Sequence, residues 1–357
     1  MKKYFLKTLL LVLCVTVTSC TNENLGSQEN DQENVLKSTG NSWNDIYNYN
    51  GILVFPSIER FVEVQNILND QIEAAENAFL DQYSEYDDEA LNEIEEEIGY
   101  NDNQPLIDFE QSFGFSSLRD HIATLEADWL QNDELDNATD PDNHFIVDEV
   151  VRTFLNVAAE VKIGSSIFIF RDGYTIEILD CNFDLLEIIR DMPTLEQVLE
   201  IEEGVNVVDT GMKRLKVDVS TIDVNQDTNI DIPDCETANM KRNSDKVTSG
   251  NRRIKWVLSV WYHPWADGAI AKTKAYKKKR RRGWKKYRTR ISARVYGDLV
   301  NHWGGNCDIE SVDDHKSKRA RKVKTKRVGK ISTTKSGYIK GEHTGPNGIH
   351  HHTVLTW

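Results

Sequence analysis

The twelve-residue window from Asp223 to Asp234 carries oxygen-bearing side chains at the spacing of a calcium-binding loop. Positions 1, 3, 5, 7, 9 and 12 of this window are Asp223, Asn225, Asp227, Asn229, Asp231 and Asp234. An EF-hand-type loop uses such positions to wrap a hard cation in about six to eight oxygens. Thr228 stands where the sharp turn requires glycine, Asp234 replaces the bidentate glutamate, and no clear helix flanks the window. These departures favour an acidic linker with Asx-turns, and calcium binding is the second interpretation.

The N-terminus carries an export signal that ends in a cysteine. Lys2-Lys3 precedes an apolar run over 5–17, and small residues then close the run in Val17-Thr18-Ser19-Cys20. The run is too short to span a bilayer comfortably, which indicates a cleaved signal peptide rather than a retained membrane helix. The closing residues resemble the lipobox of bacterial lipoproteins. This resemblance implies that the Cys20 thiol is acylated and anchors the protein in a membrane; an ordinary secretory signal is the alternative.

A basic and aromatic stretch in the last third of the chain is the candidate ligand-binding surface. Its residues are Lys278, Arg280, Arg282, Trp284, Tyr287 and Arg288. Cations interleaved with rings bind single-stranded nucleic acid, with the cation on phosphate and the ring on a base. For an exported protein, an anionic glycan or lipopolysaccharide is the better-matched partner, and nucleic acid is disfavoured. Two other interpretations are favoured over any external ligand: the cations solvate a sheet face and its edges, or they dock on the acidic part of the same chain.

Two further groups of residues could carry chemistry. Cys181, Cys235 and Cys307 remain after export, and an odd count allows one disulfide and one free thiol. Cys181 follows a strand-like run and is the expected buried thiol, so we predict a Cys235–Cys307 bridge. Near the C-terminus, His343 and the run 350–352 gather four imidazoles, but without metal-ligand spacing elsewhere in the sequence a metal site is disfavoured.

Enzyme signatures are absent from the sequence. There is no Gly-x-Ser-x-Gly elbow, no phosphate-cradling glycine loop and no His-Glu-x-x-His pair. Carboxylates are too numerous in the first two thirds of the chain to nominate a glycosidase pair. The sequence therefore favours a binding or structural role over catalysis, and an envelope polysaccharide hydrolase is the alternative.

Charge divides the chain into two parts. Residues 1–240 hold 13 lysines and arginines against 50 aspartates and glutamates, whereas residues 241–357 hold 30 against 8. Net charges of −37 and +22 indicate two structural units, each with its own surface field. The predicted organisation is a signal peptide (1–19), a lipidated disordered tether (20–43), an acidic α+β domain (44–210), an acidic linker with the calcium window (211–250) and a basic all-β domain (251–357).

Hydrophobic spacing predicts helices in the acidic part and strands in the basic part. A strand over 52–55 leads to Ser57, the expected N-cap of the first helix. Further helices are predicted over 87–98 and 116–131, after Asp142, and near 183–191 and 194–203. The turn Asp172-Gly173 joins the β-rich runs 161–170 and 174–178 in a hairpin. The predicted fold class is α+β: a mainly helical N-terminal domain with a β-hairpin, then an all-β, sandwich-like or barrel-like domain with strands near 254–262, 269–276, 287–295, 319–332, 337–342 and 351–356.

The whole arrangement resembles the uncharacterised lipoproteins of Bacteroidota-type bacteria. The resemblance rests on the start Ser19-Cys20-Thr21-Asn22-Glu23-Asn24, the polar tether, and the segments Phe115-Ser116-Ser117-Leu118-Arg119 and Ile163-Gly164-Ser165-Ser166-Ile167. It spans roughly the first 180 residues and brings no activity with it. It implies an outer-membrane protein, lipid-anchored on the periplasmic or the cell-surface side.

Overall fold

The computed structural model describes most of the chain after residue 42. The described residues are 43–132, 139–201, 203–209, 213–214, 241–263, 266–280, 282–301, 308–329, 331–332 and 338–356. Cys20, the window Asp223–Asp234, Cys235 and Cys307 lie outside them, so the expectations for these residues stay predictions. Within the described residues, no helix has the length and apolar character needed to cross a bilayer.

Helices fill most of the acidic part: α1 (Ile58–Gln82), α2 (Asp88–Glu97), α3 (Gln104–Ser112), α4 (Leu118–Gln131) and α5 (Glu149–Phe154). The predicted cap of α1 is confirmed, because the Ser57 hydroxyl accepts a hydrogen bond from the Arg60 amide at 3.3 Å. The helix expected after Asp142 begins only at Glu149, with Asp148 as its N-cap. Asp142 instead turns its carboxylate toward Arg152, as described below.

A small mixed sheet adjoins these helices. Its strands run in chain order: β1 (Tyr47–Tyr49), β2 (Ile52–Phe55), β3 (Glu160–Ile163), β4 (Ser166–Arg171), β5 (Tyr174–Ile178) and β6 (Val205–Asp209). The β4–β5 hairpin forms at the predicted Asp172-Gly173 turn. Gly164, with φ at 61°, makes a second turn inside the run expected as one strand, so this run becomes β3 and β4. Two short helices, α6 (Phe183–Arg190) and α7 (Leu195–Leu199), complete the region.

The basic part is a β-sandwich of two sheets in which nearly all neighbouring strands are antiparallel. One sheet has the order β11 (Gly283–Lys286), β10 (Ala266–Lys279), β9 (Arg252–His263), β8 (Lys241–Ser249) and β7 (Lys213–Arg214), with β14 (Lys322–Gly329) paired to β10. The other has the order β13 (Asp308–Ala320), β12 (Thr289–Asn301), β16 (Tyr338–Thr344) and β17 (His350–Thr356), with β15 (Ile331–Ser332) paired to β12. The α+β class with a β-rich C-terminal part is confirmed.

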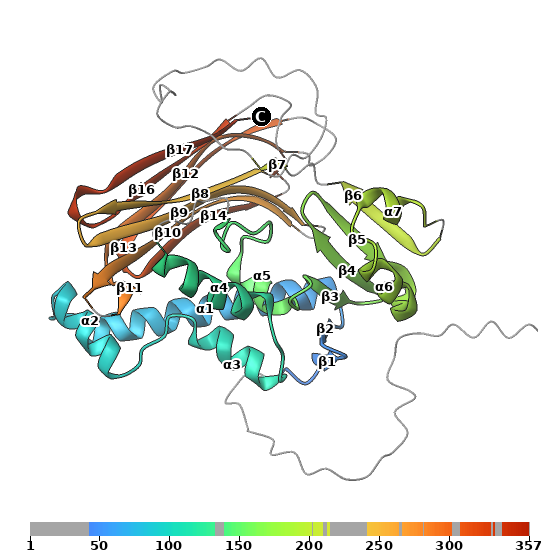
Figure 1. The fold of residues 1–357 in the computed structure, drawn as a ribbon, viewed down its shortest axis with the longest axis horizontal. Coiled ribbons are helices and arrows are strands. Elements are labelled where there is room, and N and C mark those ends of the chain that lie inside the picture. Colours follow the sequence, from blue (N-terminus) through green and yellow to red (C-terminus); the bar gives the residue numbers. More distant parts are fainter. Residues whose placement is uncertain are drawn as a thin grey trace, which may run out of the picture.

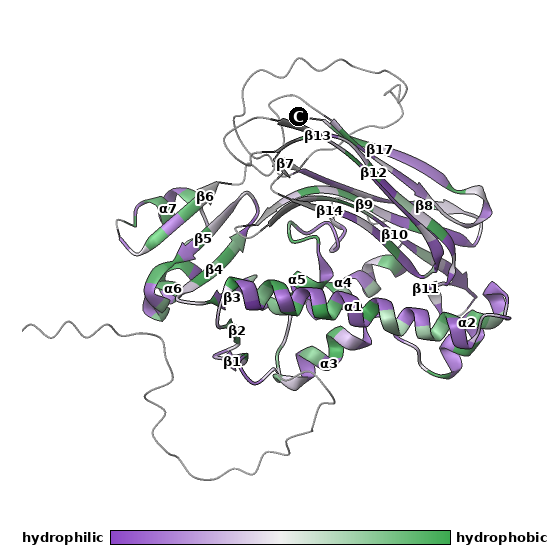
Figure 2. Ribbon diagram, turned by 180° about the vertical axis from the view of Figure 1, so that it is seen from behind, coloured by the Kyte–Doolittle hydropathy of each residue, from purple (hydrophilic) through white to green (hydrophobic). Residues whose placement is uncertain are grey.

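The layers stack as helices, sheet and sheet. In Figure 1 the helices α1, α4 and α5 lie beneath the sheet that contains β9, β10 and β14, and β16 and β17 lie in the layer beyond it. Alternate side chains of the strands fill the space between the two sheets, where Leu258, Ala271, Ile291, Val295 and Leu355 pack in one core. Hydrophilic as well as hydrophobic residues run along the strands and helices that face each other (Figure 2). Lys255, Lys272 and Lys274 are buried against carboxylates of the helical part, so the layer between the helices and this sheet is not a purely apolar core.

Candidate binding site between the helices and the sandwich

The sheet face that meets the helices carries lysines. Because side chains alternate along a strand, the residues next to those of the sandwich core point toward the helices. On three neighbouring strands these residues are Lys255, Lys272, Lys274, Lys322, Lys324 and Lys326. The register places like charges opposite each other, since Lys272 pairs with Lys324 and Lys274 with Lys322. Like charges in register destabilise a sheet, so this face requires carboxylates from the other layer.

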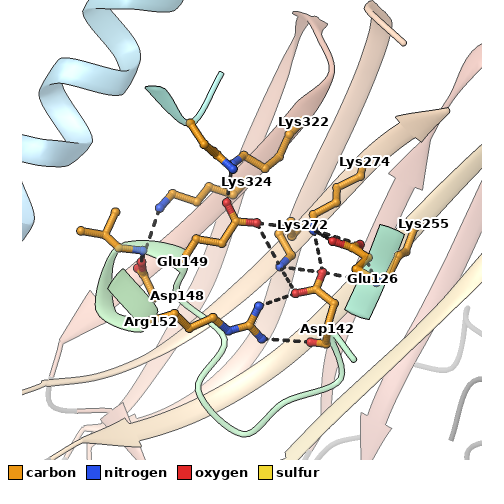
Figure 3. Close-up of polar contacts among 12 residues, drawn as sticks. Glu126, Asp142, Asp148, Glu149, Arg152, Lys255, Lys272, Lys274, Lys322 and Lys324 are labelled. Atoms are coloured by element: carbon orange, nitrogen blue, oxygen red, sulfur yellow. Dashed lines mark hydrogen bonds and ion pairs between the residues drawn. The ribbon is translucent and has the colours of Figure 1, made fainter. Parts of the chain in front are cut away.

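Carboxylates from α4, from the loop before α5 and from the start of α5 supply that charge (Figure 3). We call the following residues the buried ionic cluster: Glu126, Asp140, Asp142, Glu149, Arg152, Lys255, Lys272 and Lys274. Lys255 Nζ lies 2.7 Å from Glu126 Oε1 and 2.6 Å from Asp140 Oδ1. Lys274 Nζ lies 2.9 Å from Glu126 Oε2 and 2.9 Å from Asp142 Oδ2.

Asp142 is the centre of the buried ionic cluster. Its side chain is fully buried, with Arg152 Nη1 at 2.5 Å, Lys272 Nζ at 3.0 Å and Lys255 Nζ at 3.6 Å. The cluster holds four acids and four bases, so its formal charges balance. Balance is needed because burial of an ion without a partner costs several kcal/mol of folding free energy. That cost is comparable to the net stability of a whole domain.

The pKa values follow from burial and from these partners. Burial raises the pKa of the Asp142 carboxyl, but Lys272, Lys274, Lys255 and Arg152 outweigh it and hold this pKa well below its usual range. Burial also raises the pKa of Glu126, but Lys255 and Lys274 outweigh it and lower this pKa to about 2. Burial lowers the pKa of Lys272 to about 8, against the pull of Asp142. At neutral pH the carboxylates Glu126 and Asp142 are therefore ionised, and Lys272 is the base closest to losing its proton.

The predicted ligand-binding stretch docks on the same helices. Arg288 is fully buried, with Nε 2.6 Å from Glu95 Oε1 and Nη1 3.3 Å from Glu76 Oε1. The buried Tyr287 donates its hydroxyl to Glu89 Oε2 at 3.1 Å. The indole of Trp284 is buried as well, beside Trp129 and Leu130 of α4. Arg282 Nη1 lies 2.5 Å from Glu96 Oε1, although its side chain is 65% exposed. Of the two favoured interpretations, docking on the acidic part is the arrangement that the structure shows for these four residues, whereas Lys278 and Arg280 are exposed.

A cavity of about 190 Å³ opens at the edge of this interface, between α4, α5, β10 and β11. Apolar residues of α4, among them Ile122 and Leu130, form one wall, and the rings of Tyr276 and Trp284 line it as well. Its charged lining residues are Arg119, Arg152, Lys274, Lys285, Lys286, Glu126 and Glu149. Four of these cations already have carboxylate partners: Arg119 pairs with Glu110, Arg152 with Asp142, Lys274 with Glu126 and Lys286 with Asp102. Lys285 is exposed and forms no ion pair within the described residues, so its charge is available to a ligand.

Cys181 differs from its expected state. It is buried and disulfide-bonded, so the prediction that it is the free thiol is wrong. Its partner lies outside the described residues. Cys235 and Cys307 also lie outside them, so the predicted bridge between these two residues stays a prediction.

The lysines of the buried ionic cluster were not singled out from the sequence. The pattern Ala271-Lys272-Thr273-Lys274-Ala275 does alternate, as a half-buried strand should. Lysine at every second position normally marks the solvent side of such a strand, so periodicity alone assigns these side chains to the surface. The opposite net charges of the two parts of the chain were the one signal that pointed to docking.

Comparison with known proteins adds little to this description. No family model matches the chain, and no curated protein matches it. Among solved structures, the chain is similar to a DUF4848 family protein from Bacteroides thetaiotaomicron, with 13% identity over 87% of this chain and 100% of that one, at a TM-score of 0.19. A TM-score this low does not establish a common fold.

Proposed function

We propose that the protein is a lipid-anchored protein of the outer membrane that binds a small anionic ligand, an acidic sugar of an envelope glycan, in the cavity beside α4. The observation that carries this proposal is an exposed lysine, Lys285, in the lining of a cavity that two aromatic rings also line. Pockets for drug-sized molecules measure about 300–1,000 Å³, so a cavity of about 190 Å³ suits a single sugar ring. Tyr276 and Trp284 offer ring faces or edges to a sugar, and Lys285 offers a cation to its carboxylate.

The same cavity disfavours the hydrolase alternative. A glycosidase needs one carboxyl group that stays protonated at neutral pH, which requires a raised pKa. The two carboxylates in the cavity have lowered pKa values instead: burial raises them, but Lys255 and Lys274 outweigh it for Glu126, and Lys322 and Lys274 outweigh it for Glu149. Both groups are committed to lysines, so neither serves as a proton donor.

Binding to acidic and neutral oligosaccharides tests the ligand class. We expect the purified protein to bind uronic-acid oligosaccharides on a glycan array and in calorimetry, and to release no reducing ends from them. Lys285→Ala removes an exposed cation of the cavity and should weaken binding about tenfold, the scale of one hydrogen bond to a charged group. Arg280→Ala removes an exposed cation outside the cavity and is the matched control. Equal binding of neutral sugars, or equal effects of the two variants, would contradict the proposal.

Fractionation tests the anchor. In a bacterial host that processes lipoproteins, the wild-type protein should sediment with the outer membrane, and Cys20→Ala should move it to the soluble fraction. A single acyl chain gives only reversible binding, so the multiple acylation that the lipobox implies is what keeps the protein with the membrane during washing. Unchanged membrane association of Cys20→Ala would exclude acylation of Cys20 as the anchor.

A further inference from the structure

Two histidines lie side by side on β17, a strand of the sheet that does not meet the helices. Side chains alternate along β17, so His350 and His352 share one face and His351 lies on the other. His351 stacks on the buried ring of Trp256 at 4.5 Å, which fixes its face as the inner one. The rings of His350 and His352 have centroids 4.3 Å apart and planes at 67°. His350 is exposed and the His352 side chain is 34% exposed, so a solute can reach both rings.

A carboxylate completes this group from the neighbouring strand. Glu342 of β16 is the cross-strand partner of His352, and its Oε1 lies 3.8 Å from His352 Nδ1. Its Oε2 lies 3.4 Å from Nη1 of Arg294, whose guanidinium is held by Asp313 at 2.7 and 2.8 Å. The carboxylate is thus oriented with one oxygen toward the histidines.

The nitrogen that faces this carboxylate is unpartnered. His352 Nδ1 is buried and has no hydrogen-bond partner among the described residues. An imidazole nitrogen that has no hydrogen-bond partner can serve as a ligand to a transition metal.

We propose that His350, His352 and Glu342 bind one zinc ion on this face. Imidazole nitrogen and carboxylate oxygen are zinc ligands at about 2.0–2.2 Å, and three protein ligands with a water make an open site. Two atoms bound to one tetrahedral zinc lie about 3.3 Å apart, so the 3.8 Å between His352 Nδ1 and Glu342 Oε1 must shorten by less than an ångström. No trio of such residues in the described part of the chain is already at coordinating distance, so the three side chains close on the ion by rotation. The site lies on a different sheet from the cavity and does not depend on the ligand proposed there.

Zinc titration of the purified, metal-stripped protein tests the site. Competition with a chromophoric zinc chelator, in buffer with millimolar calcium to occupy the acidic window Asp223–Asp234, gives affinity and stoichiometry. We expect one site that is weakened at least about tenfold by His350→Ala and by His352→Ala, and that is lost when both are replaced. Glu342→Gln keeps one site with lower affinity. His121→Ala replaces an exposed histidine of α4 and should change nothing.

Thermal unfolding supplies a second readout. Zinc should raise the melting temperature of the wild-type protein and of His121→Ala, because an ion that binds only the folded state stabilises it, but not that of the double variant. The two outward histidines are not part of the sandwich core, so the metal-free variants should melt like the wild-type protein. A double variant that binds zinc as tightly as the wild type, or a wild-type protein that takes up no zinc, overturns the proposal.

Discussion

Replacing Asp142 by asparagine tests whether the buried ionic cluster holds the two layers together. Asparagine keeps the shape of the side chain and removes its charge, which faces Arg152 at 2.5 Å, Lys274 at 2.9 Å and Lys272 at 3.0 Å. The balanced cluster then has one excess positive charge without access to water. Loss of one partner from a buried ion pair costs about 3–5 kcal/mol, and we expect the free energy of unfolding of Asp142→Asn to fall by that amount at pH 7.

Lys272 gives this prediction a pH signature. Its pKa is about 8 because of burial, and Asp142 is the main group that opposes the shift. In Asp142→Asn the pKa of folded Lys272 falls further, because the carboxylate that raised it is gone, while the unfolded chain keeps the proton up to about pH 10. A folded-state pKa below the unfolded one means that the free energy of unfolding rises with pH, by at most about 1.4 kcal/mol per unit for one proton. Between pH 7 and pH 9 the wild-type protein gains about 1.4 kcal/mol in free energy of unfolding, because the pKa of Lys272 lies within this range, and the variant gains more. The stability deficit of the variant should therefore narrow by up to about 1.4 kcal/mol.

Urea denaturation followed by tryptophan fluorescence and circular dichroism measures both effects. Glu93→Gln removes an exposed carboxylate from α2 and is the control, with an expected change within about 0.5 kcal/mol. In the Asp142→Asn background, Lys272→Met should recover part of the loss, because it removes the unpaired cation. The reasoning is refuted if Asp142→Asn costs no more than the control at pH 7, or if its deficit is the same at pH 9.

Three further outcomes are expected. His343 is fully buried, and burial holds its pKa well below the usual range, so only the unfolded chain takes up a proton there below about pH 6.5. The free energy of unfolding should therefore fall by about 1 kcal/mol per unit as the pH drops from 6 to 5. His343→Leu should reduce this slope, and replacement of the exposed His121 by leucine should leave it unchanged. Small-angle scattering should give the same radius of gyration at 0.1 and 1 M salt, because buried ion pairs are screened far less than exposed ones; expansion at 1 M would mean that the layers separate. Millimolar calcium should raise the melting temperature if the Asp223–Asp234 window binds it, and an equal shift with magnesium would favour the linker.

The sequence predicted those helices and turns whose signals lie within a few residues of each other along the chain. Ser57 caps α1, and Asp172-Gly173 turns the hairpin, because each signal acts within a few residues. Strands β8 and β13 were missed because their sequences, Lys-Arg-Asn-Ser-Asp-Lys-Val-Thr-Ser in β8 for example, lack apolar alternation. They are strands because β9 and β12 offer them a complete ladder of hydrogen-bonding partners.

The candidate site was predicted only at the level of charge. The net charges of −37 and +22 indicated that the acidic and basic parts of the chain could dock on each other. They did not indicate which residues form the contacts. Lys274 and Glu126 are 148 positions apart, and only the packing of α4 on the sheet brings them to 2.9 Å. The same limit applies to Arg288, which was expected at a ligand and is bonded to Glu95 instead. Tertiary pairing of charges leaves no periodic signal along a chain.

The cluster around Asp142 also constrains how the two parts of this chain can change over generations. Lys255, Lys272 and Lys274 depend on carboxylates that are encoded more than 100 positions earlier. A replacement on one side alone leaves a charge without its counter-ion, whereas a matched replacement on both sides keeps the balance. Exchange of one part between diverged relatives should therefore produce poorly folding hybrids, and the acidic and basic parts should be inherited as one unit.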